Sequence, residues 1–380
     1  MSKTLDYLTP QFPHMLGLLE ALVNHDSPTF DKQAVDAMGR QISETFARLG
    51  ASVEAHPQSD YGDHFRVTWG RGSRQILLLA HFDTVWPVGE AARRPFTVHE
   101  GSATGPGVND MKSGIVVGLY ALKALVETGQ MPDHRLVYLL TSDEEDGSTT
   151  SRPLIEAEAR QSDYALVLEP SRGGPLTTWR KGIGRFILEI SGIPSHAGVD
   201  PEKGVSAIQE LAHQVLKLHA MSDPARGNTV NVGIVQGGSR VNVVAASAQA
   251  EVDLRVMTLD EGLRMEKAIL GLTPHLKGTT IKIKGGINRP PFEESAAGLA
   301  LYERARLVGA RLGLELGKTG SGGGSDGNFT AAEGVPTLDG LGAVGQGSHA
   351  LNESIIVNSL PQRAALVAEL LLDLGKSARD

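Results

Sequence analysis

LLLAHFDTV, residues 77–85, is an apolar run that stops at a histidine and, two residues later, at an aspartate. Side chains two apart on an extended strand point to the same side, so the imidazole of His81 and the carboxylate of Asp83 share one face. This arrangement is typical of a metal ligand and the group that orients it. The stretch therefore predicts a buried strand with a polar site at its carboxyl end.

Further apolar runs follow along the chain and are separated by segments with helical spacing. The strand-like runs are RQILLLA (74–80), RLVYLL (135–140) and YALVL (164–168). Helical spacing occurs in residues 31–50, which end at Gly50, and in residues 111–129. Strands that alternate with helices predict a largely parallel α/β sheet.

A second domain is predicted within the first. RFILEISG, TVNVGIVQGG and SAQAEVDLRV alternate apolar and polar residues, as expected of a half-exposed antiparallel sheet, and GVSAIQELAHQVLKLHAM has helical spacing. We expect an inserted α+β domain over residues 177–287, which closes at the glycines and prolines of KGGINRPPF. Residues 1–176 and 288–380 then form the α/β domain, with a final helix over 359–375.

Composition narrows the possible chemistry. The 380 residues contain no cysteine, which excludes thiolate catalysis and sulfur-ligated metal, and their net charge of −8 is not gathered into blocks that would suit nucleic acid. The N-terminal residues lack the apolar stretch of a signal peptide, and no apolar run approaches about 18 residues. We expect a soluble, cytoplasmic protein without membrane or nucleic-acid partners that acts on a small molecule or peptide.

Polar side chains follow each of the three apolar strands. They are His81 and Asp83 after the first, Asp143, Glu144 and Glu145 after the second, and Glu169 after the third. In open α/β sheets, sites form at the carboxyl ends of the strands, so these residues should converge. Two glycine-containing loops add Asp110, in GPGVNDMKSG, and His349, in GQGSHALNE.

Two histidines with several carboxylates suit two divalent metal ions that share a bridging carboxylate, and zinc is the first candidate. The neighbours Glu144 and Glu145 can divide two tasks, since one can bind metal while the other accepts a proton from water. Asp83 would fix the tautomer of His81. Alone, any one histidine is better explained as a surface or core residue, and DEED (143–146) as a solvated helix start. The joint order of the five segments favours the metal site.

The motifs HFDTV, GPGVNDMKSG, TSDEEDGS, LVLEPS, SHAGVDPEKGVSA, GGGSDG and GSHALNE occur in this order over most of the chain. They resemble the di-zinc aminoacylase and carboxypeptidase family, most closely its glutamate carboxypeptidase (carboxypeptidase G) branch. The resemblance implies a zinc-exopeptidase-like α/β catalytic domain with an inserted ferredoxin-like α+β domain that serves as lid and dimerisation domain. It also implies that one zinc is held by His81 and Glu169, the other by Glu145 and His349, that Asp110 bridges them, and that Glu144 is the general base.

The resemblance assigns further roles to the inserted domain. In a homodimer, His196 would reach the partner subunit's site and stabilise the oxyanion, whereas composition alone favours a capping or surface histidine. Asn242 and Arg255 would bind the substrate carboxylate, although a surface salt bridge is the alternative for Arg255. Outside the inserted domain, the loop TGSGGGSDGNF (319–329) could be read as a phosphate cradle, but it lacks the lysine of a phosphate-binding loop. Its glycines, including Gly323 and Gly324, are better explained as letting the backbone approach a substrate carboxylate.

The chain also departs from the family pattern at three points. Ala245 stands where many relatives have proline, and His349 and Glu353 are one residue closer than in the carboxypeptidase pattern. A lysine that helps to hold glutamate has no clear counterpart, and Arg180 or Lys181 could replace it.

The predicted function is a metal-dependent hydrolase. It would release a C-terminal amino acid, glutamate or another acidic residue, from an N-acyl amino acid or peptide, with two ions of zinc, cobalt or manganese. The alternatives are an N-acyl amino acid deacylase with a neutral preference and a non-catalytic binding protein of the same fold. A phosphotransfer enzyme is disfavoured by the missing lysine.

Overall fold

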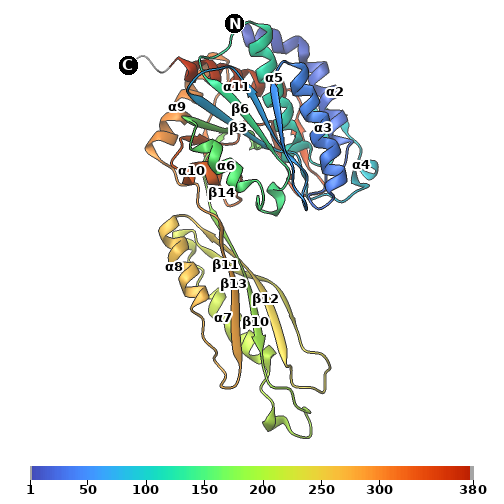
Figure 1. The fold of residues 1–380 in the computed structure, drawn as a ribbon, viewed down its shortest axis with the longest axis vertical. Coiled ribbons are helices and arrows are strands. Elements are labelled where there is room, and N and C mark those ends of the chain that lie inside the picture. Colours follow the sequence, from blue (N-terminus) through green and yellow to red (C-terminus); the bar gives the residue numbers. More distant parts are fainter. Residues whose placement is uncertain (1, 377–380) are drawn as a thin grey trace. The chain divides into compact units, whose positions relative to one another are not determined.

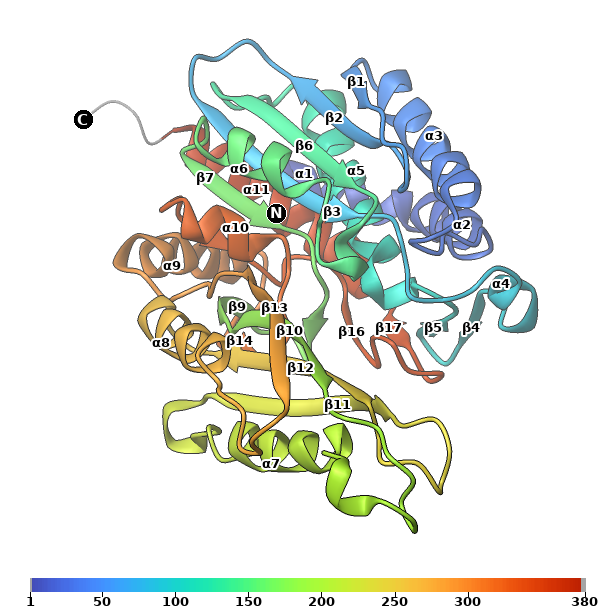
Figure 2. The same cartoon turned by 60° about the horizontal axis from the view of Figure 1, so that its bottom comes forward.

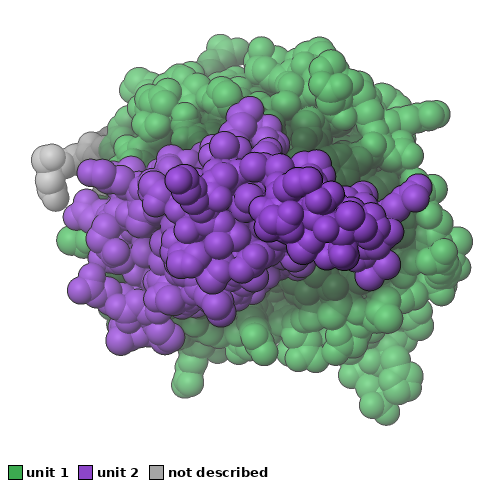
Figure 3. Space-filling view, turned by 90° about the horizontal axis from the view of Figure 1, so that it is seen from below, with its two compact units in different colours: residues 1–179, 294–320, 325–380 green, residues 180–293, 321–324 purple. Residues whose placement is uncertain are grey.

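The computed structural model describes residues 2–376, which form two compact units (Figures 1 and 3). The first unit comprises the described residues of 1–179, 294–320 and 325–380, and the second comprises 180–293 and 321–324. The second unit is therefore assembled from one long segment and one segment of four residues. The chain passes between the two units four times.

The first unit is built on a six-stranded sheet with the order β1-β2-β6-β3-β7-β15. Its strands are β1 (Ser52–His56), β2 (His64–Trp69), β6 (Arg135–Thr141), β3 (Gln75–His81), β7 (Tyr164–Val167) and β15 (Thr337–Leu338). β3 pairs in parallel with β6 on one side and with β7 on the other. The carboxyl ends of these three strands therefore lie at one edge of the sheet.

Every residue of β3 is buried because helices cover both faces of this sheet (Figure 2). Ile76, Leu78 and Ala80 belong to one core cluster, whereas Leu77 and Leu79 belong to another. The helices of this unit are α1 (Lys3–Leu8), α2 (Phe12–Val23), α3 (Lys32–Arg48), α4 (Glu90–Arg93), α5 (Ser113–Glu127), α6 (Arg152–Ala159), α9 (Ala296–Arg311), α10 (Gly327–Ala332) and α11 (Ser359–Gly375). This two-sided burial explains why residues 76–80 of β3 are continuously apolar instead of alternating.

The remaining strands form two small sheets. One is five-stranded with the order β4-β5-β17-β16-β8, and the other pairs β14 with β9. Their strands are β4 (Thr97–His99), β5 (Ser102–Thr104), β17 (Ser354–Ile356), β16 (Val344–Gln346), β8 (Ser171–Arg172), β14 (Lys318–Ser321) and β9 (Leu176–Arg180). The five-stranded sheet joins the segments next to Asp110, Glu169 and His349.

The second unit is a four-stranded antiparallel sheet with two helices packed on it. The sheet has the order β11-β12-β10-β13. The elements in chain order are β10 (Gly182–Ser191), α7 (Ala207–His219), β11 (Thr229–Gly237), β12 (Ser247–Val256), α8 (Leu259–Leu270) and β13 (Thr280–Arg289). This β-α-β-β-α-β order is the ferredoxin-like arrangement, so the predicted fold class is confirmed for both units.

Side chains on one face of this second sheet form its core with the two helices. The cluster includes Phe186 and Leu188 of β10, Leu211 of α7 and Ile269 of α8. The alternating pattern of β12, exposed then buried, follows from this one-sided packing. Among residues 2–376, none of the helices is both long enough and apolar enough to cross a membrane.

Candidate metal centre

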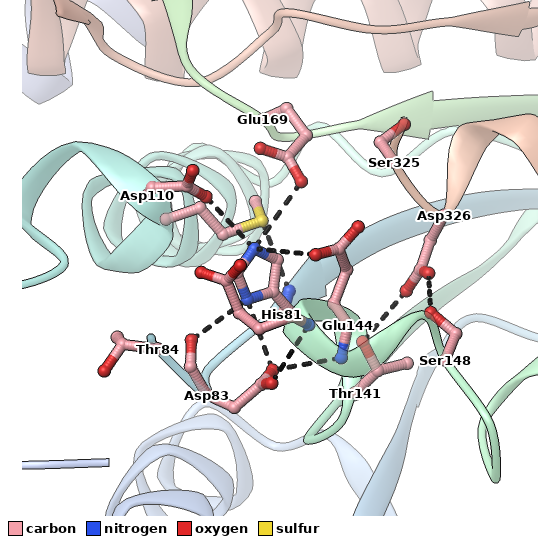
Figure 4. Close-up of polar contacts among 12 residues, drawn as sticks. His81, Asp83, Thr84, Asp110, Thr141, Glu144, Ser148, Glu169, Ser325 and Asp326 are labelled. Atoms are coloured by element: carbon pink, nitrogen blue, oxygen red, sulfur yellow. Dashed lines mark hydrogen bonds and ion pairs between the residues drawn. The ribbon is translucent and has the colours of Figure 1, made fainter. Parts of the chain in front are cut away.

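Three strand ends in the first unit bring the predicted polar residues together (Figure 4). His81 is the last residue of β3, and Glu169 follows β7. Glu144 and Glu145 lie in a short 3-10 turn, Glu144–Asp146, that follows β6. Asp110 and His349 come from loops, so the site combines side chains from five separate stretches of the chain, as the sequence predicts.

His81 is held in a fixed orientation. Its side chain is 1% exposed, and its Nδ1 lies 3.1 Å from the backbone oxygen of Asp83 and 3.3 Å from Asp83 Oδ1. The other ring nitrogen, Nε2, lies 3.2 Å from Asp110 Oδ1 and 3.5 Å from Glu169 Oε1. An imidazole whose Nδ1 faces such acceptors presents Nε2 to a metal ion.

His349 faces the opposite oxygen of Asp110. Its Nε2 lies 3.5 Å from Asp110 Oδ2 and 3.0 Å from Glu145 Oε2. The residue has a φ of 63°, a left-handed conformation that is uncommon for a residue with a side chain and is found more often at functional sites. Asp110 thus directs one oxygen to each histidine, which is the geometry of a bridging carboxylate.

The donor atoms form two groups of three, in each of which all ligand atoms lie within 4.8 Å of one another. The groups are His81, Asp110 and Glu169, and Asp110, Glu145 and His349. Glu145 Oε1 is buried and has no hydrogen-bond partner among the described residues. Nitrogen and oxygen donors without sulfur suit zinc, cobalt or manganese, so these residues fit two divalent ions that share Asp110.

The charges of the site also favour a cation. Burial raises the pKa of Glu145 to about 7, despite its contact with His349. The pKa of His349 is raised to about 9, chiefly by its hydrogen bond to Glu145. Burial by itself lowers the pKa of His81, but the surrounding carboxylates of Asp110, Asp83 and Glu169 raise it well above 6.5. Without a metal, protons therefore supply part of the positive charge that these carboxylates need.

Asp83 supports the turn that contains the two glutamates. It is buried, and its carboxylate accepts the backbone N–H groups of Glu144 and Glu145 at 3.3 and 3.2 Å and the hydroxyl of Thr29 at 2.8 Å. Glu144 Oε2 lies 4.0 Å from His81 Nε2, and Glu144 belongs to neither group of ligands. Glu144 is therefore beside the centre with a carboxylate that neither group uses.

Glu353 is a supporting residue to which sequence reasoning gave no role. It is fully buried and accepts the N–H groups of Gly107, Asn109 and Asp110 at 2.9–3.0 Å and the indole N–H of Trp86 at 3.0 Å. It thereby fixes the loop that carries the bridging Asp110. The acidic residue four positions after His349 was visible in the sequence, but its partner loop, more than 240 residues away, was not.

The predicted residues of the inserted domain lie in the second unit. His196 is exposed, and its Nδ1 accepts the N–H groups of Gly198 and Val199, both at 3.1 Å, which leaves the proton on Nε2. Asn242 is also exposed, and its backbone oxygen accepts the N–H of Ala197 at 3.0 Å. The two residues therefore come from neighbouring loops of one unit.

Arg255 and residues 322–324 of the glycine-rich loop make contacts within the second unit. The Arg255 guanidinium donates to both oxygens of Asp253, at 2.8 and 2.9 Å from Nε and Nη2, and to the oxygen of Gly322 at 3.3 Å. The backbone oxygens of Gly323 and Gly324 accept from Arg180 at 3.3 and 3.2 Å. The binding of a substrate carboxylate by these residues stays a prediction.

At one edge of an α/β sheet, strand ends and two loops bring together two imidazoles and three carboxylates, with a general-base candidate beside them. This combination defines the class of dinuclear metal-dependent hydrolases.

Comparison with known proteins gives the family. The model of Peptidase family M20/M25/M40 matches residues 77–373, and the chain belongs to this family. It is 33% identical over 387 residues to carboxypeptidase G2 of Pseudomonas sp. (strain RS-16), an alignment that covers 97% of this chain and 91% of that protein. The resemblance predicted from the motifs is confirmed, and the chain is an enzyme of the metallopeptidase and amidohydrolase class.

Two further relatives show the breadth of the family. Succinyl-diaminopimelate desuccinylase of Dechloromonas aromatica (strain RCB) is 29% identical over 320 residues, which cover 79% of this chain and 83% of that protein. The crystal structure of aminopeptidase PepT from Bacillus cereus ATCC 10987 has a TM-score of 0.79 at 24% identity and covers 96% of this chain and 99% of its own. The latter likeness supports the fold.

Proposed function

We propose that the enzyme hydrolyses the amide bond that joins a C-terminal amino acid to an N-acyl group or peptide, and that it prefers glutamate or another acidic residue. The hydrolytic part is supported by the position of Glu144, whose Oε2 lies 4.0 Å from His81 Nε2 and which belongs to neither ligand group. The choice of substrate is supported by the 33% identity with a carboxypeptidase over nearly the whole chain.

In this proposal one ion is held by His81, Asp110 and Glu169, and the other by Asp110, Glu145 and His349. Zinc is the first candidate, with cobalt and manganese as alternatives. When bound, such ions supply Lewis acidity that polarises the scissile carbonyl and lowers the pKa of a water molecule. Asp83 orients His81 through Nδ1 and so keeps Nε2 available to the ion.

Glu144 has the role of general base. Its carboxylate accepts a proton from the attacking water and later donates it to the nitrogen of the leaving amine. The hydrogen bonds from the N–H groups of Glu144 and Glu145 to Asp83 keep this carboxylate beside the ligands while the proton moves.

An N-acyl amino acid deacylase with a neutral preference is the second candidate. The observation that favours it is the 29% identity with a protein named as a desuccinylase over 79% of this chain. Both candidates use the same residues for hydrolysis and differ in the amino acid that they release.

A substrate series distinguishes these candidates. One acyl group is joined to glutamate, glutamate α-amide, leucine or lysine, and kcat/KM is measured with zinc, cobalt and manganese. The proposal predicts the highest value for glutamate and a 10- to 100-fold loss for the α-amide, since a charge-assisted hydrogen bond contributes about 1.5–3 kcal/mol. Efficient cleavage of the α-amide would refute recognition of the carboxylate, and preference for leucine would favour the neutral deacylase.

Glu144→Gln tests the chemistry. The variant should retain two metal ions per chain by elemental analysis, because Glu144 is outside both ligand groups. Its kcat should fall by roughly 10²- to 10⁴-fold, the range that general-base catalysis supplies. Near-normal turnover would exclude Glu144 as the base.

We also infer that the enzyme is a homodimer through the second unit. β11 is an edge strand of its sheet, and its Ile234 and Val235 are exposed. Ile208 and Leu216 on α7 are also exposed. A long apolar edge strand is usually covered in the native assembly. If His196 acts on the partner subunit, mixed dimers of Glu144→Gln and His196→Ala should regain activity, and no recovery despite proven subunit exchange would contradict this.

A further inference from the structure

A buried carboxylate of the glycine-rich loop contacts both ends of the turn that carries Glu144 and Glu145. Asp326 is 4% exposed, and each of its carboxylate oxygens accepts a hydrogen bond from a different hydroxyl group (Figure 4). Oδ2 accepts from Thr141 at 3.0 Å, and Oδ1 accepts from Ser148. Thr141 ends β6 and Ser148 follows the turn, so a single carboxylate joins the chain before and after the two glutamates.

Helix capping does not account for this carboxylate. Asp326 is the N-cap residue of α10, a position that aspartate favours, but its side chain makes no capping bond. The N–H of Gly327 donates instead to Ser325 Oγ at 3.0 Å. The Asp326 carboxylate is therefore directed to the turn and not to its own helix.

The backbone is irregular where the chain leaves the turn. Gly147 and Ser148 have φ values of 90° and 59°, and side-chain-bearing residues seldom adopt the left-handed region. Asp83 accepts the N–H groups of Glu144 and Glu145, within the turn, whereas Asp326 holds its two ends. Together these two carboxylates restrain the backbone of the turn.

We propose that Asp326 is a positioning residue for hydrolysis, which fixes the Glu144–Asp146 turn through the hydroxyl groups of Thr141 and Ser148. Asp326 belongs to neither ligand group and acts through the position of Glu144. The inference rests on the proposed function in taking Glu144 as the general base. Misplacement of a catalytic group by about 1 Å can reduce a rate by roughly 100-fold.

Asp326→Asn is the first variant. The amide nitrogen of the asparagine cannot accept a hydrogen bond, so one of the two bonds from Thr141 and Ser148 is lost. At saturating zinc, kcat should fall 10- to 100-fold while KM stays within two-fold of the parental value. The control is Glu158→Gln, a buried carboxylate that pairs with Arg66 at 2.6 Å elsewhere in the same unit. It should lower stability without lowering kcat. An unchanged kcat in Asp326→Asn, or an equal loss in the control, would overturn the proposal.

Thr141 supplies a second pair of variants that keeps the proposal testable if Asp326→Asn does not fold. Thr141→Val removes the hydroxyl at nearly constant volume, whereas Thr141→Ser keeps it. The serine variant should retain kcat, and the valine variant should lose it with little change in KM. Equal kcat values in the two variants would overturn the proposal.

Hydrogen–deuterium exchange of the metal-free protein gives a readout without turnover. Exchange in a peptide covering residues 141–151 should accelerate in Asp326→Asn and Thr141→Val but not in Thr141→Ser or Glu158→Gln. Unchanged exchange in the first two variants would contradict the inference. If the parental enzyme cleaves no member of the substrate series, the proposed function fails, whereas an active parent with equally active variants refutes only the role of Asp326.

Discussion

Glu145 in the first unit and Glu210 in the second are glutamates with side chains 7% and 0% exposed, yet their pKa values move in opposite directions. Burial raises the pKa of Glu145 to about 7, and its Oε1 has no hydrogen-bond partner among residues 2–376. Burial also acts on Glu210, but hydrogen bonds hold its pKa at about 2.

The bonds to Glu210 come entirely from the second unit. Its oxygens accept from the side chain of Gln214 at 2.6 Å, the N–H groups of His275 and Leu276 at 2.9 and 2.6 Å, and the hydroxyl of Thr279 at 3.1 Å. Hydrogen bonds from the protein thus stabilise the ionised form of Glu210, whereas Glu145 Oε1 receives no such bond from the described residues and is available to a metal ion. A structural carboxylate and a ligand are distinguished here by what their oxygens lack, since burial is similar in both.

Removal of metal should produce the largest difference between the two regions. Chelation should abolish hydrolysis. It should also lower the free energy of unfolding of the first unit by about 4 kcal/mol, compared with protein in free metal at 1,000 times the Kd. Trp69, Trp86 and Trp179 all lie in the first unit, so tryptophan fluorescence during urea unfolding reports on it.

Hydrogen exchange in α7, which carries Glu210, is the internal control and should not change on chelation. Zinc, cobalt or manganese should restore activity. Full turnover by protein shown to be metal-free by elemental analysis would break the comparison.

The second-largest effect should be a loss of stability at low pH, caused by protonation of Glu210. Its pKa is lower in the folded state, about 2, than the ordinary value of 4.5, so its contribution is complete above pH 4.5 and is lost as the pH falls toward 2. The loss is about 3 kcal/mol. Far-UV circular dichroism during urea unfolding measures it, because the second unit has no tryptophan or tyrosine.

Glu210→Gln is the matched variant, since it preserves the shape and cannot titrate. It should be less stable than the parental protein at pH 7, and the difference should shrink as the pH approaches 2. A constant difference across this range would show that ionised Glu210 contributes nothing.

The smallest effect is expected from substitution of Glu353, which shares features with both Glu145 and Glu210. Like Glu210 it accepts backbone N–H groups, but it does so in the loop that carries Asp110. Glu353→Gln should weaken metal binding by 10- to 100-fold, as the loss of an outer partner of a ligand usually does. Calorimetric titration of the metal-free variant measures this, and an unchanged Kd would limit Glu353 to a packing role.

The residues of the metal centre can be predicted from the sequence because they follow strands with a clear apolar pattern. The apolar run before His81 predicts a buried strand, and parallel strands bring His81, Glu144 and Glu169 to one edge. The supporting contacts were not predictable in this way. Asp326 and Thr141 are 185 residues apart, and the loop that contains Asp326 has no periodicity. Only the order of the strands in the sheet brings such loops together.

The second unit illustrates the same limit. A change in pattern suggests one inserted segment, 177–287, whereas the compact unit also includes residues 321–324. These four residues are SGGG, whose composition gives no sign of where they pack. Their partners are backbone and arginine groups, as in the bond from the N–H of Lys181 to the oxygen of Ser321 at 3.0 Å.

This two-part construction has a consequence for the inheritance of the second unit. A gene rearrangement that exchanges only the codons for residues 180–293 between relatives would combine a new β10 with an old Ser321–Gly324 segment. Gly324 packs closely against the long segment, because a Cβ there would lie 2.8 Å from Cδ1 of Ile183 and 2.9 Å from Cδ of Arg289, and these side chains would have to shift. We therefore expect chimaeras that carry both segments from the same parent to be more stable than those that mix them.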